Sequence, residues 1–178
     1  LVAIEERFGS WMVQYGYANL ITGEKLVEHG TVAGDGLLAV KGAMYRAVCA
    51  LYEPMVDARL LALLQEFARR GGLVIWSSIP PMLDLSGATV ADAWGRLFGL
   101  RLEPTPDPLG LAVPSRQVTF GGALAKVSPM MILTDFVVDR VFPVEPLADT
   151  EAVAWVRTGG ATRQRCVGTR KVYPGGGQ

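Results

Sequence analysis

The sequence predicts an α/β fold in which a parallel sheet is extended by antiparallel strands toward the C-terminus. The first observation is a strand, helix and strand pattern, in which the apolar runs 45–52 and 73–76 flank one amphipathic helix. A helical crossover of this kind joins parallel strands through a right-handed connection. The second observation is a change after residue 114 to short β-like segments separated by turns, which favours antiparallel pairing.

The elements of this pattern have clear boundaries. Asp57 can cap the helix, and Gly71-Gly72 ends it. The apolar stripe of the helix consists of Leu60, Leu63, Leu64 and Phe67. The flanking runs 45–52 and 73–76 are largely apolar, which predicts strands that are buried on both faces.

Turn residues and periodicity predict the elements that come before this pattern. The first thirty residues are typical of helix, and residues 22–29 form a short helix that Gly30 ends. Turns at 35–36 and 41–42 then enclose a strand at 37–40.

The elements after the pattern follow from the same signals. A proline-rich loop at 79–86 leads to a helix that Gly99 closes, and residues 103–114 form a further loop. The apolar stripe of this helix consists of Val90, Ala93, Trp94, Leu97 and Phe98. The β segments that follow are 116–120, 136–144, 151–157 and 163–173.

The chain is expected to be one module over residues 1–178, with a βαβ-rich part at 1–102 and a β-rich part at 103–178. It begins with leucine and stops at 174–178 in what is typical of a hairpin turn, so we expect a fragment of a longer chain. The acidic pair Glu5-Glu6 interrupts the start, so no signal peptide is expected there.

Composition and charge argue against two classes of protein. Half of the residues are hydrophobic and 19% are charged, which is enough for a sizeable core. The 17 basic residues balance the 17 acidic residues, and no nucleic-acid partner is expected, because phosphate binding needs clustered positive charge. No apolar run reaches the roughly 18 residues of a membrane helix, so no membrane partner is expected. The densest basic stretch, which we expect on the solvent face of a strand, consists of Arg163, Arg165, Arg170 and Lys171.

Taken in order, several segments resemble one known family. They are 35–40 (DGLLAV), 45–51 (YRAVCAL), 67–76 (FARRGGLVIW), 94–99 (WGRLFG), 152–156 (AVAWV) and 168–177. Together they resemble the class I glutamine-amidotransferase-like domain that is embedded in glycoside hydrolases. The nearest form is the middle, trimerisation domain of family 42 β-galactosidases, and related modules occur in α-L-rhamnosidase-like enzymes. The resemblance covers roughly residues 19–177.

The resemblance implies a flavodoxin-like three-layer sheet that supports a catalytic barrel and an oligomer. The implied partners are the other domains of the parent chain and further copies of the module, as a trimer. The residues of the family's barrel that cut the glycosidic bond have no counterpart here, and the first family strand is missing or shortened at 1–4.

Nucleophilic catalysis has weak support in the sequence. Amidotransferases of class I need a cysteine on a tight elbow, followed later in the chain by histidine and an acid. The sole histidine, His29, precedes Cys49 and Cys166, and neither cysteine has the flanking glycines of an elbow. Both thiols are expected to be free and buried. Ser77-Ser78 follow a strand, but Trp76 and Ile79 occupy the positions that an elbow gives to glycine, so these serines are expected to form hydrogen bonds at the strand end.

Metal and phosphate chemistry also lack a signal. One histidine without a nearby cysteine argues against zinc. The Gly71-Gly72 pair follows a helix, whereas a phosphate-binding loop precedes one. No cofactor and no metal ligand are therefore expected.

The best candidate for a ligand or interface site is the crevice at the carboxyl ends of the parallel strands. Its residues would be Tyr52, Glu53, Trp76, Ser77 and Asp84. Open parallel sheets bind ligands at this edge, aromatic side chains stack on sugars or pack at interfaces, and two carboxylates can form a glycosidase dyad. Acids at strand ends also cap helices or face water, and both Asp57 and Asp84 are expected to precede helices.

These features of the sequence leave three functions open. The preferred one is a noncatalytic structural and oligomerisation module of a glycoside-hydrolase-like, carbohydrate-processing protein. The second is a sugar-binding or other small-molecule domain that uses the crevice. The third is a divergent hydrolase built on Ser77 or Cys49.

Overall fold

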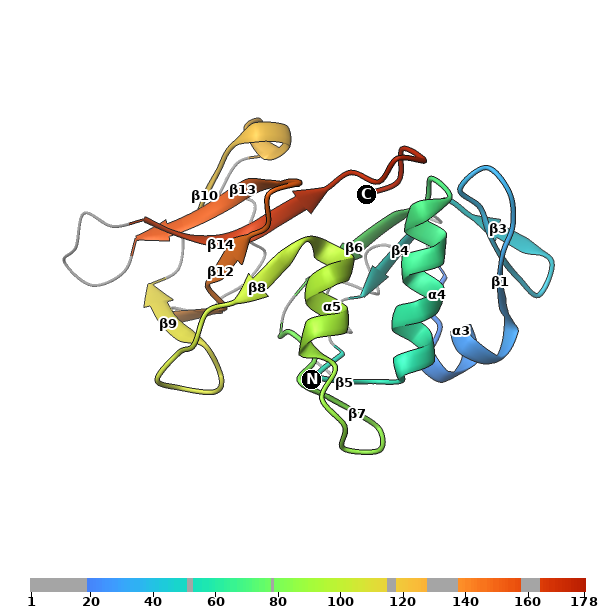
Figure 1. Cartoon of the computed structure of the whole chain (residues 1–178), viewed down its shortest axis with the longest axis horizontal. Helices are drawn as coiled ribbons and strands as arrows, with labels where there is room; N and C mark the ends of the chain where they lie inside the picture. Colours follow the sequence, from blue (N-terminus) through green and yellow to red (C-terminus); the bar gives the residue numbers. More distant parts are fainter. Residues whose placement is uncertain (1–18, 51–52, 78, 115–117, 128–137, 158–163) are drawn as a thin grey trace. The chain divides into compact units, whose positions relative to one another are not determined.

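The computed structural model shows a mixed α/β chain that forms two compact units (Figure 1). It describes residues 19–50, 53–77, 79–114, 118–127, 138–157 and 164–178. Unit 1 contains residues up to Val90 together with Tyr173–Gln178, and unit 2 contains Ala91–Val172. The expected α/β class is confirmed. Parallel pairing is limited, within the described residues, to two short pairs of strands, and the other pairings are antiparallel.

The described part of unit 1 begins with a short helix, and two hairpin turns follow it. Helix α3 (Gly23–His29) has Thr22 as its N-cap and ends at Gly30, as predicted. Strands β1 (Gly30–Val32), β2 (Leu38–Val40) and β3 (Ala43–Tyr45) form one antiparallel sheet. The sequence predicts the first strand at 37–40, so it does not predict β1.

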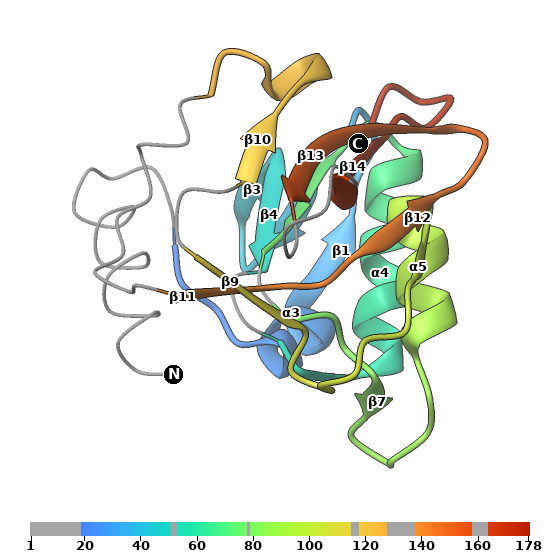
Figure 2. The same cartoon turned by 90° about the vertical axis from the view of Figure 1, so that its left-hand side faces the viewer.

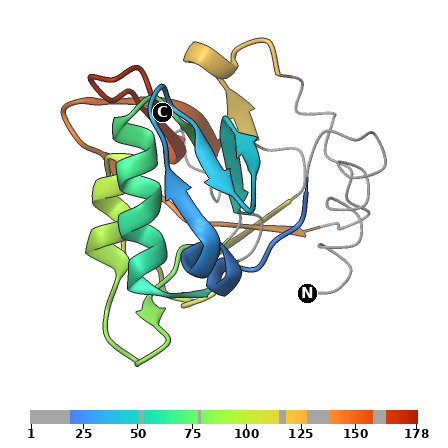
Figure 3. The same ribbon diagram turned by 90° about the vertical axis from the view of Figure 1, so that its right-hand side faces the viewer.

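The two turns of this sheet adopt backbone angles that few side chains tolerate. Asp35, Gly36, Lys41 and Gly42 all have positive φ, as hairpin turns of the primed types require. The predicted turns at 35–36 and 41–42 are therefore confirmed. Figure 3 shows α3 and β1 (blue) beside the long helix of unit 1, which both elements contact.

That long helix, α4 (Ala58–Arg69), is the centre of the unit 1 core. Asp57 is its N-cap, with Oδ1 accepting from the backbone N–H of Arg59 at 2.8 Å. Its buried residues are Leu60, Leu61, Leu64, Phe67 and Ala68. The helix ends where Gly72 N donates to the carbonyl oxygen of Phe67 at 3.0 Å and Gly71 takes φ +103, as predicted.

Helix α4 connects the parallel strands β4 (Ala47–Ala50) and β6 (Leu73–Trp76). The predicted parallel crossover is therefore confirmed. The predicted start of the first strand at Tyr45 is wrong, because Tyr45 is the last residue of β3 and Arg46 separates the two strands. The expected burial on both faces is also wrong, because alternate residues of β4 and β6 are exposed.

A second parallel pair follows at the carboxyl end of the first. Strand β5 (Met55–Val56) precedes α4 and pairs with β7 (Leu83–Asp84), which comes after β6 along the chain. The loop from β7 to residue 90 closes on itself through an isolated bridge between Leu83 and Thr89.

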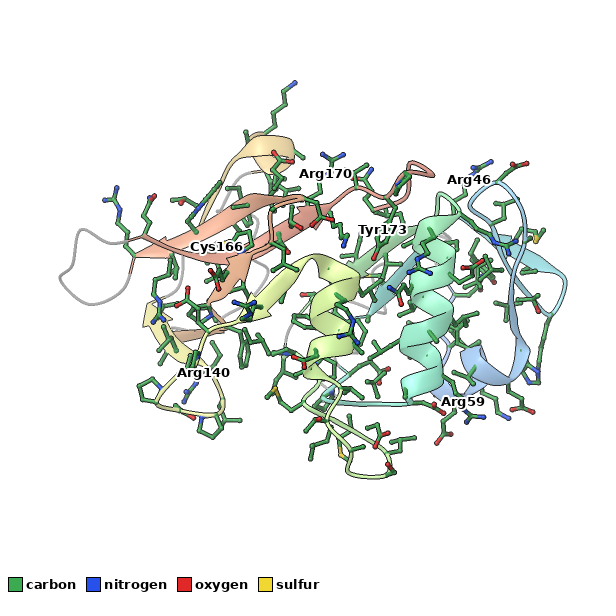
Figure 4. The ribbon with its side chains drawn as sticks, viewed as in Figure 1. Arg46, Arg59, Arg140, Cys166, Arg170 and Tyr173 are labelled. Atoms are coloured by element: carbon green, nitrogen blue, oxygen red, sulfur yellow. The ribbon has the colours of Figure 1, made fainter. Side chains whose placement is uncertain are left out.

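The last six residues return to unit 1 and lie along β6. Gln178 N donates to the carbonyl oxygen of Gly72 at 3.2 Å, and Val74 N donates to the carbonyl oxygen of Gln178 at 2.6 Å. These two bonds flank Leu73, which is the pattern of a parallel bridge. Tyr173 is buried at the start of this segment (Figure 4).

The described part of unit 2 contains one α-helix, the short 3-10 helix η2 (Gly122–Leu124) and a set of antiparallel strands. Helix α5 (Ala91–Phe98) buries Trp94 and Leu97 and ends at Gly99, as predicted. Strand β8 (Leu100–Leu102) pairs with β12 (Val144–Pro146), and β9 (Leu111–Pro114) pairs with β11 (Val138–Val141). Figure 2 shows β9 and β11 running side by side. Residues 111–114 were expected in a loop, so this part of the prediction is wrong.

A three-stranded sheet in unit 2 contains β13 and β14, the longest strands among the described residues. Strands β13 (Thr150–Arg157) and β14 (Gln164–Lys171) form an antiparallel hairpin, and β10 (Val118–Phe120) pairs with the other edge of β13. The predicted β segments 151–157 and 163–173 correspond to this hairpin. The turn expected at 159–160 lies outside the described residues.

Candidate functional site

The candidate crevice residues occupy different local environments in unit 1. Tyr52 lies outside the described residues, and so does Ser78, which follows Ser77 in the sequence. Glu53 precedes β5, Trp76 ends β6, Ser77 follows it, and Asp84 ends β7. Each of the four described side chains can be assigned to a local environment.

Trp76 and Ser77 continue the strand and anchor the loop that follows it. Trp76 is half-buried, and its indole Nε1 donates to the carbonyl oxygen of Ile79 at 3.4 Å. Ser77 is exposed, and its backbone N–H donates to the carbonyl oxygen of Ala50 at 2.9 Å, which extends the β4–β6 ladder. This bond uses the backbone of Ser77, so the hydrogen-bonding role expected of the serine side chain stays a prediction.

Glu53 lies at the amino end of α3. A Cβ atom added to Gly23, the first residue of that helix, would be 3.8 Å from Glu53 Oε1 and 3.0 Å from Leu60 Cδ2. The amino end of a helix carries partial positive charge from its unpaired N–H groups, so a carboxylate there is stabilising. Glu53 Oε1 therefore lies close to the first residue of α3.

Asp84 organises a turn and does not cap a helix, so the expectation that it precedes a helix as a cap is wrong. Its Oδ1 accepts from Ser86 N at 2.8 Å, from Ser86 Oγ at 2.6 Å and from Ala88 N at 2.9 Å. Hydrogen bonds from Ser86 and Ala88 lower the pKa of the Asp84 carboxyl. The carboxylate is thus ionised and already bonded within residues 84–88, which leaves it poorly suited to act as an acid in a glycosidase dyad.

The only imidazole lies at the end of α3. His29 Nε2 is 3.6 Å from Glu28 Oε1, and Glu28 also accepts from Lys25 Nζ at 2.5 Å. The hydrogen bond from Lys25, followed by the interaction with His29, lowers the pKa of Glu28. Within the described part of the chain, no hydrogen bond joins His29 to a thiol or a serine hydroxyl.

The two cysteines are free, as expected, but their expected burial is wrong. Cys49 is exposed and Cys166 is half-buried. The surrounding protein nonetheless removes enough water from each sulfur to raise both thiol pKa values. Cys166 Sγ donates to the carbonyl oxygen of Gly168 at 3.3 Å. Raised pKa values are the opposite of what an activated nucleophile requires.

The most prominent feature that the sequence does not predict is an apolar, exposed side of the β4–β6 pair. Register partners on parallel strands point to the same side, and Ala47 pairs with Leu73 while Cys49 pairs with Ile75. Leu73 is 36% exposed, Ile75 is 45% exposed, and Ala47 and Cys49 are exposed as well. We call these four residues the open face. On the other side, Val74 is 5% exposed, and α4 packs against β6.

Unit 2 uses its charged side chains in pairs. Arg165 lies 2.5 Å from Glu103, Arg170 lies 3.3 Å from Glu151, and Lys171 lies 3.3 Å from Asp149. Three of the four residues of the predicted basic stretch are therefore paired with acids. The fourth, Arg163, lies outside the described residues. The stretch is balanced by acids.

The described residues contain no group of three or more His, Cys, Asp and Glu side chains that could hold a metal ion. None of the helices in the described part of the chain is long and apolar enough to span a bilayer. No protein-family model matches the chain, and no curated protein matches it significantly.

Proposed function

We propose that this chain is a noncatalytic structural and oligomerisation module of a glycoside-hydrolase-like, carbohydrate-processing protein. The observation that carries the proposal is the open face. Parallel strands are usually covered on both faces, and exposed apolar surface gains about 25 cal/mol for each Å² that is removed from water. A second apolar surface that covers Leu73 and Ile75 would therefore stabilise the module.

The local roles of the polar residues support the same proposal. Asp57 caps α4, Asp84 holds a turn, and Glu53 lies at the start of α3. The carboxylates near the strand ends thus stabilise unit 1. The order of the family-like segments supports the glycoside-hydrolase context and a flavodoxin-like, three-layer arrangement, in which a further layer would lie on the open face.

The partner that we propose for the open face is a further copy of the chain, and the resemblance favours a trimer. Sedimentation equilibrium over a range of protein concentrations tests the proposal. The unchanged chain should associate as its concentration rises, and Ile75→Glu should shift it to the monomer, because the carboxylate would be buried without a partner. Val127→Glu is the control, since Val127 is 41% exposed in unit 2, and it should leave the association unchanged. A chain that stays monomeric throughout would contradict the oligomerisation.

Activity measurements test the noncatalytic part. The chain should not turn over aryl glycosides or glutamine above background. Turnover that Ser77→Ala or Cys49→Ala abolishes would establish a divergent hydrolase. Heat released on titration with galactose or rhamnose, and lost in Trp76→Ala, would establish a sugar-binding domain.

A further inference from the structure

The segment Tyr173–Gln178 occupies a defined slot on unit 1. Its two ends are anchored: Tyr173 is 7% exposed, and Gln178 bonds to Gly72 and Val74 on β6. Between the ends the chain makes a tight turn, in which Gly176 N donates to the carbonyl oxygen of Tyr173 at 2.8 Å and Tyr173 N donates to that of Gly177 at 2.7 Å.

The slot accepts glycine and excludes larger residues at two positions. A Cβ atom on Gly177 would lie 1.9 Å from the carbonyl oxygen of Ala68, and one on Gly175 would lie 2.2 Å from that of Arg69. These are backbone atoms of α4, so they cannot move aside as a flexible side chain would. A Cβ atom on Gly176 would meet nothing within 4 Å.

The slot itself also depends on glycine. Gly71 faces the segment, because a Cβ atom there would be 3.0 Å from the carbonyl oxygen of Gly175. Gly36 packs against Gly71, because a Cβ atom added to Gly36 would lie 2.5 Å from the carbonyl carbon of Gly71. The end of α4, the start of β6 and the 35–36 turn therefore form a surface that fits a tight, glycine-rich turn.

The segment reaches this slot from the other unit. Lys171 ends β14 in unit 2, and Tyr173 belongs to unit 1, so Val172 is the residue at which the chain passes between them. Val172 is 49% exposed. Non-covalent contacts thus hold the segment in unit 1, and it follows an exposed connecting residue; elements attached in this way exchange between copies in domain swapping.

We propose that the slot on unit 1 binds residues 173–178 of a second copy of the chain, with the same contacts that it makes to its own segment. This inference rests on the proposed oligomerisation and assigns a specific contact to it. The exchanged contacts are identical, so exchange is governed by protein concentration and by the conformation at Val172, and no new interface is needed.

A cross-linking experiment on the full chain tests the exchange. The starting protein carries Cys49→Ser and Cys166→Ser, which remove both native thiols. One population then receives Leu73→Cys and the other receives Gln178→Cys, because Gln178 bonds to both neighbours of Leu73. The two populations are unfolded together in urea, refolded at high concentration and treated with a short bis-maleimide. The expected product is a dimer that contains one chain of each kind.

Two controls make the result decisive. A chain with both Leu73→Cys and Gln178→Cys should cross-link within itself at low concentration, which checks the position of Gln178. Adding Gly177→Val to the Gln178→Cys population should abolish the mixed dimer, whereas Gly176→Asn should retain it, since asparagine tolerates positive φ and the Cβ position there is open.

The outcomes separate this inference from the proposed function. Cross-linking within the double variant without a mixed dimer at any concentration would overturn the exchange, and so would a double variant that does not cross-link. In either case, concentration-dependent association that Ile75→Glu abolishes would still support oligomerisation through the open face.

Discussion

Cys49 and Ile75 are register partners in the parallel β4–β6 pair, and both side chains are exposed on the side away from α4. Their neighbours Val48 and Val74 form the next register pair and point to the opposite side, where Val74 is buried. One strand pair thus has a buried apolar face and an exposed apolar face. This asymmetry links the fold of unit 1 to the proposed assembly, and the thiol of Cys49 can be used to probe it.

The first prediction concerns thiol labelling. Cys49 should react with iodoacetamide before Cys166, because Cys49 is exposed, whereas Cys166 is half-buried and its thiol donates to Gly168. Both should react more slowly than in the unfolded chain, since raised pKa values leave less thiolate at neutral pH. Mass spectrometry of the single variants Cys49→Ser and Cys166→Ser measures each rate. Faster labelling of Cys49 in the folded chain than in urea would show an activated thiol and contradict the proposed noncatalytic function.

The sequence predicts local elements well where one short-range signal decides them. Asp57 supplies the N-cap of α4, and Gly71 supplies the positive φ that ends it. Both signals act within a few residues. The parallel crossover is predictable for the same reason, because a strand, a helix and a strand of these lengths can connect in few ways.

Burial of the strands could not be predicted, because it depends on what packs against each face. The residues of 47–50 and 73–76 are largely apolar on both sides, and this pattern is the same whether the second face is covered or open. The same limit applies to Asp84. An acid before a predicted helix can serve as a cap, but Ser86 and Ala88 offer closer donors.

The C-terminal segment shows a long-range contact that the sequence indicates only weakly. Glycines at 175–177 suggest a turn, and Gly176 does take a positive φ. Their fit against α4 depends on backbone atoms more than one hundred residues earlier in the chain, such as the carbonyl oxygen of Ala68. Sequence periodicity does not predict such a contact between two backbone segments.

The second prediction concerns the core of unit 1. Phe67 is 0% exposed, and Phe67→Ala should lower the free energy of unfolding by about 3–5 kcal/mol, because it leaves a cavity beside α4. Leu85→Ala is the control. Leu85 is 58% exposed, so the change should stay within about 0.5 kcal/mol. Urea denaturation followed by circular dichroism measures both, and equal effects would contradict the assignment of the core.

The third prediction concerns the helix end. Gly71→Ala should destabilise unit 1 by about 1 kcal/mol or more, because φ +103 is strained for alanine and the Cβ position is only 3.0 Å from the carbonyl oxygen of Gly175. Gly34→Ala should be neutral or slightly stabilising, since Gly34 has ordinary φ and open space around it. Thermal unfolding of the two variants side by side provides the comparison. A neutral Gly71→Ala would show that the segment 173–178 does not pack against this turn.

The fourth prediction concerns the cap of α4. Asp57→Ala should lower the midpoint of urea unfolding, because the backbone N–H of Arg59 loses its acceptor. Asp57→Asn should retain most of the stability, since the amide oxygen can accept the same bond. If Asp57→Asn lowers the unfolding midpoint as much as Asp57→Ala does, the cap contributes little to stability. The main contribution of Asp57 would then be its ion pair with Arg59 at 2.6 Å.

The fifth prediction concerns acid stability and the turn that Asp84 holds. Hydrogen bonds from Ser86 and Ala88 lower the pKa of Asp84 below its ordinary value of 3.8. The folded state therefore binds this proton less readily than the unfolded state does. The contribution of the carboxylate to stability is fully present above 3.8 and is lost as pH falls through the lower folded value. Asp84→Asn keeps an acceptor oxygen but cannot titrate, so the difference in unfolding midpoint between the unchanged chain and Asp84→Asn should shrink as pH falls below 3.8. Leu85→Ala serves as the control, because it changes an exposed side chain of the same turn and removes no titratable group, and its difference from the unchanged chain should stay constant over this pH range. A difference for Asp84→Asn that stays constant down to the lowest pH would show that the charge on Asp84 does not stabilise the turn.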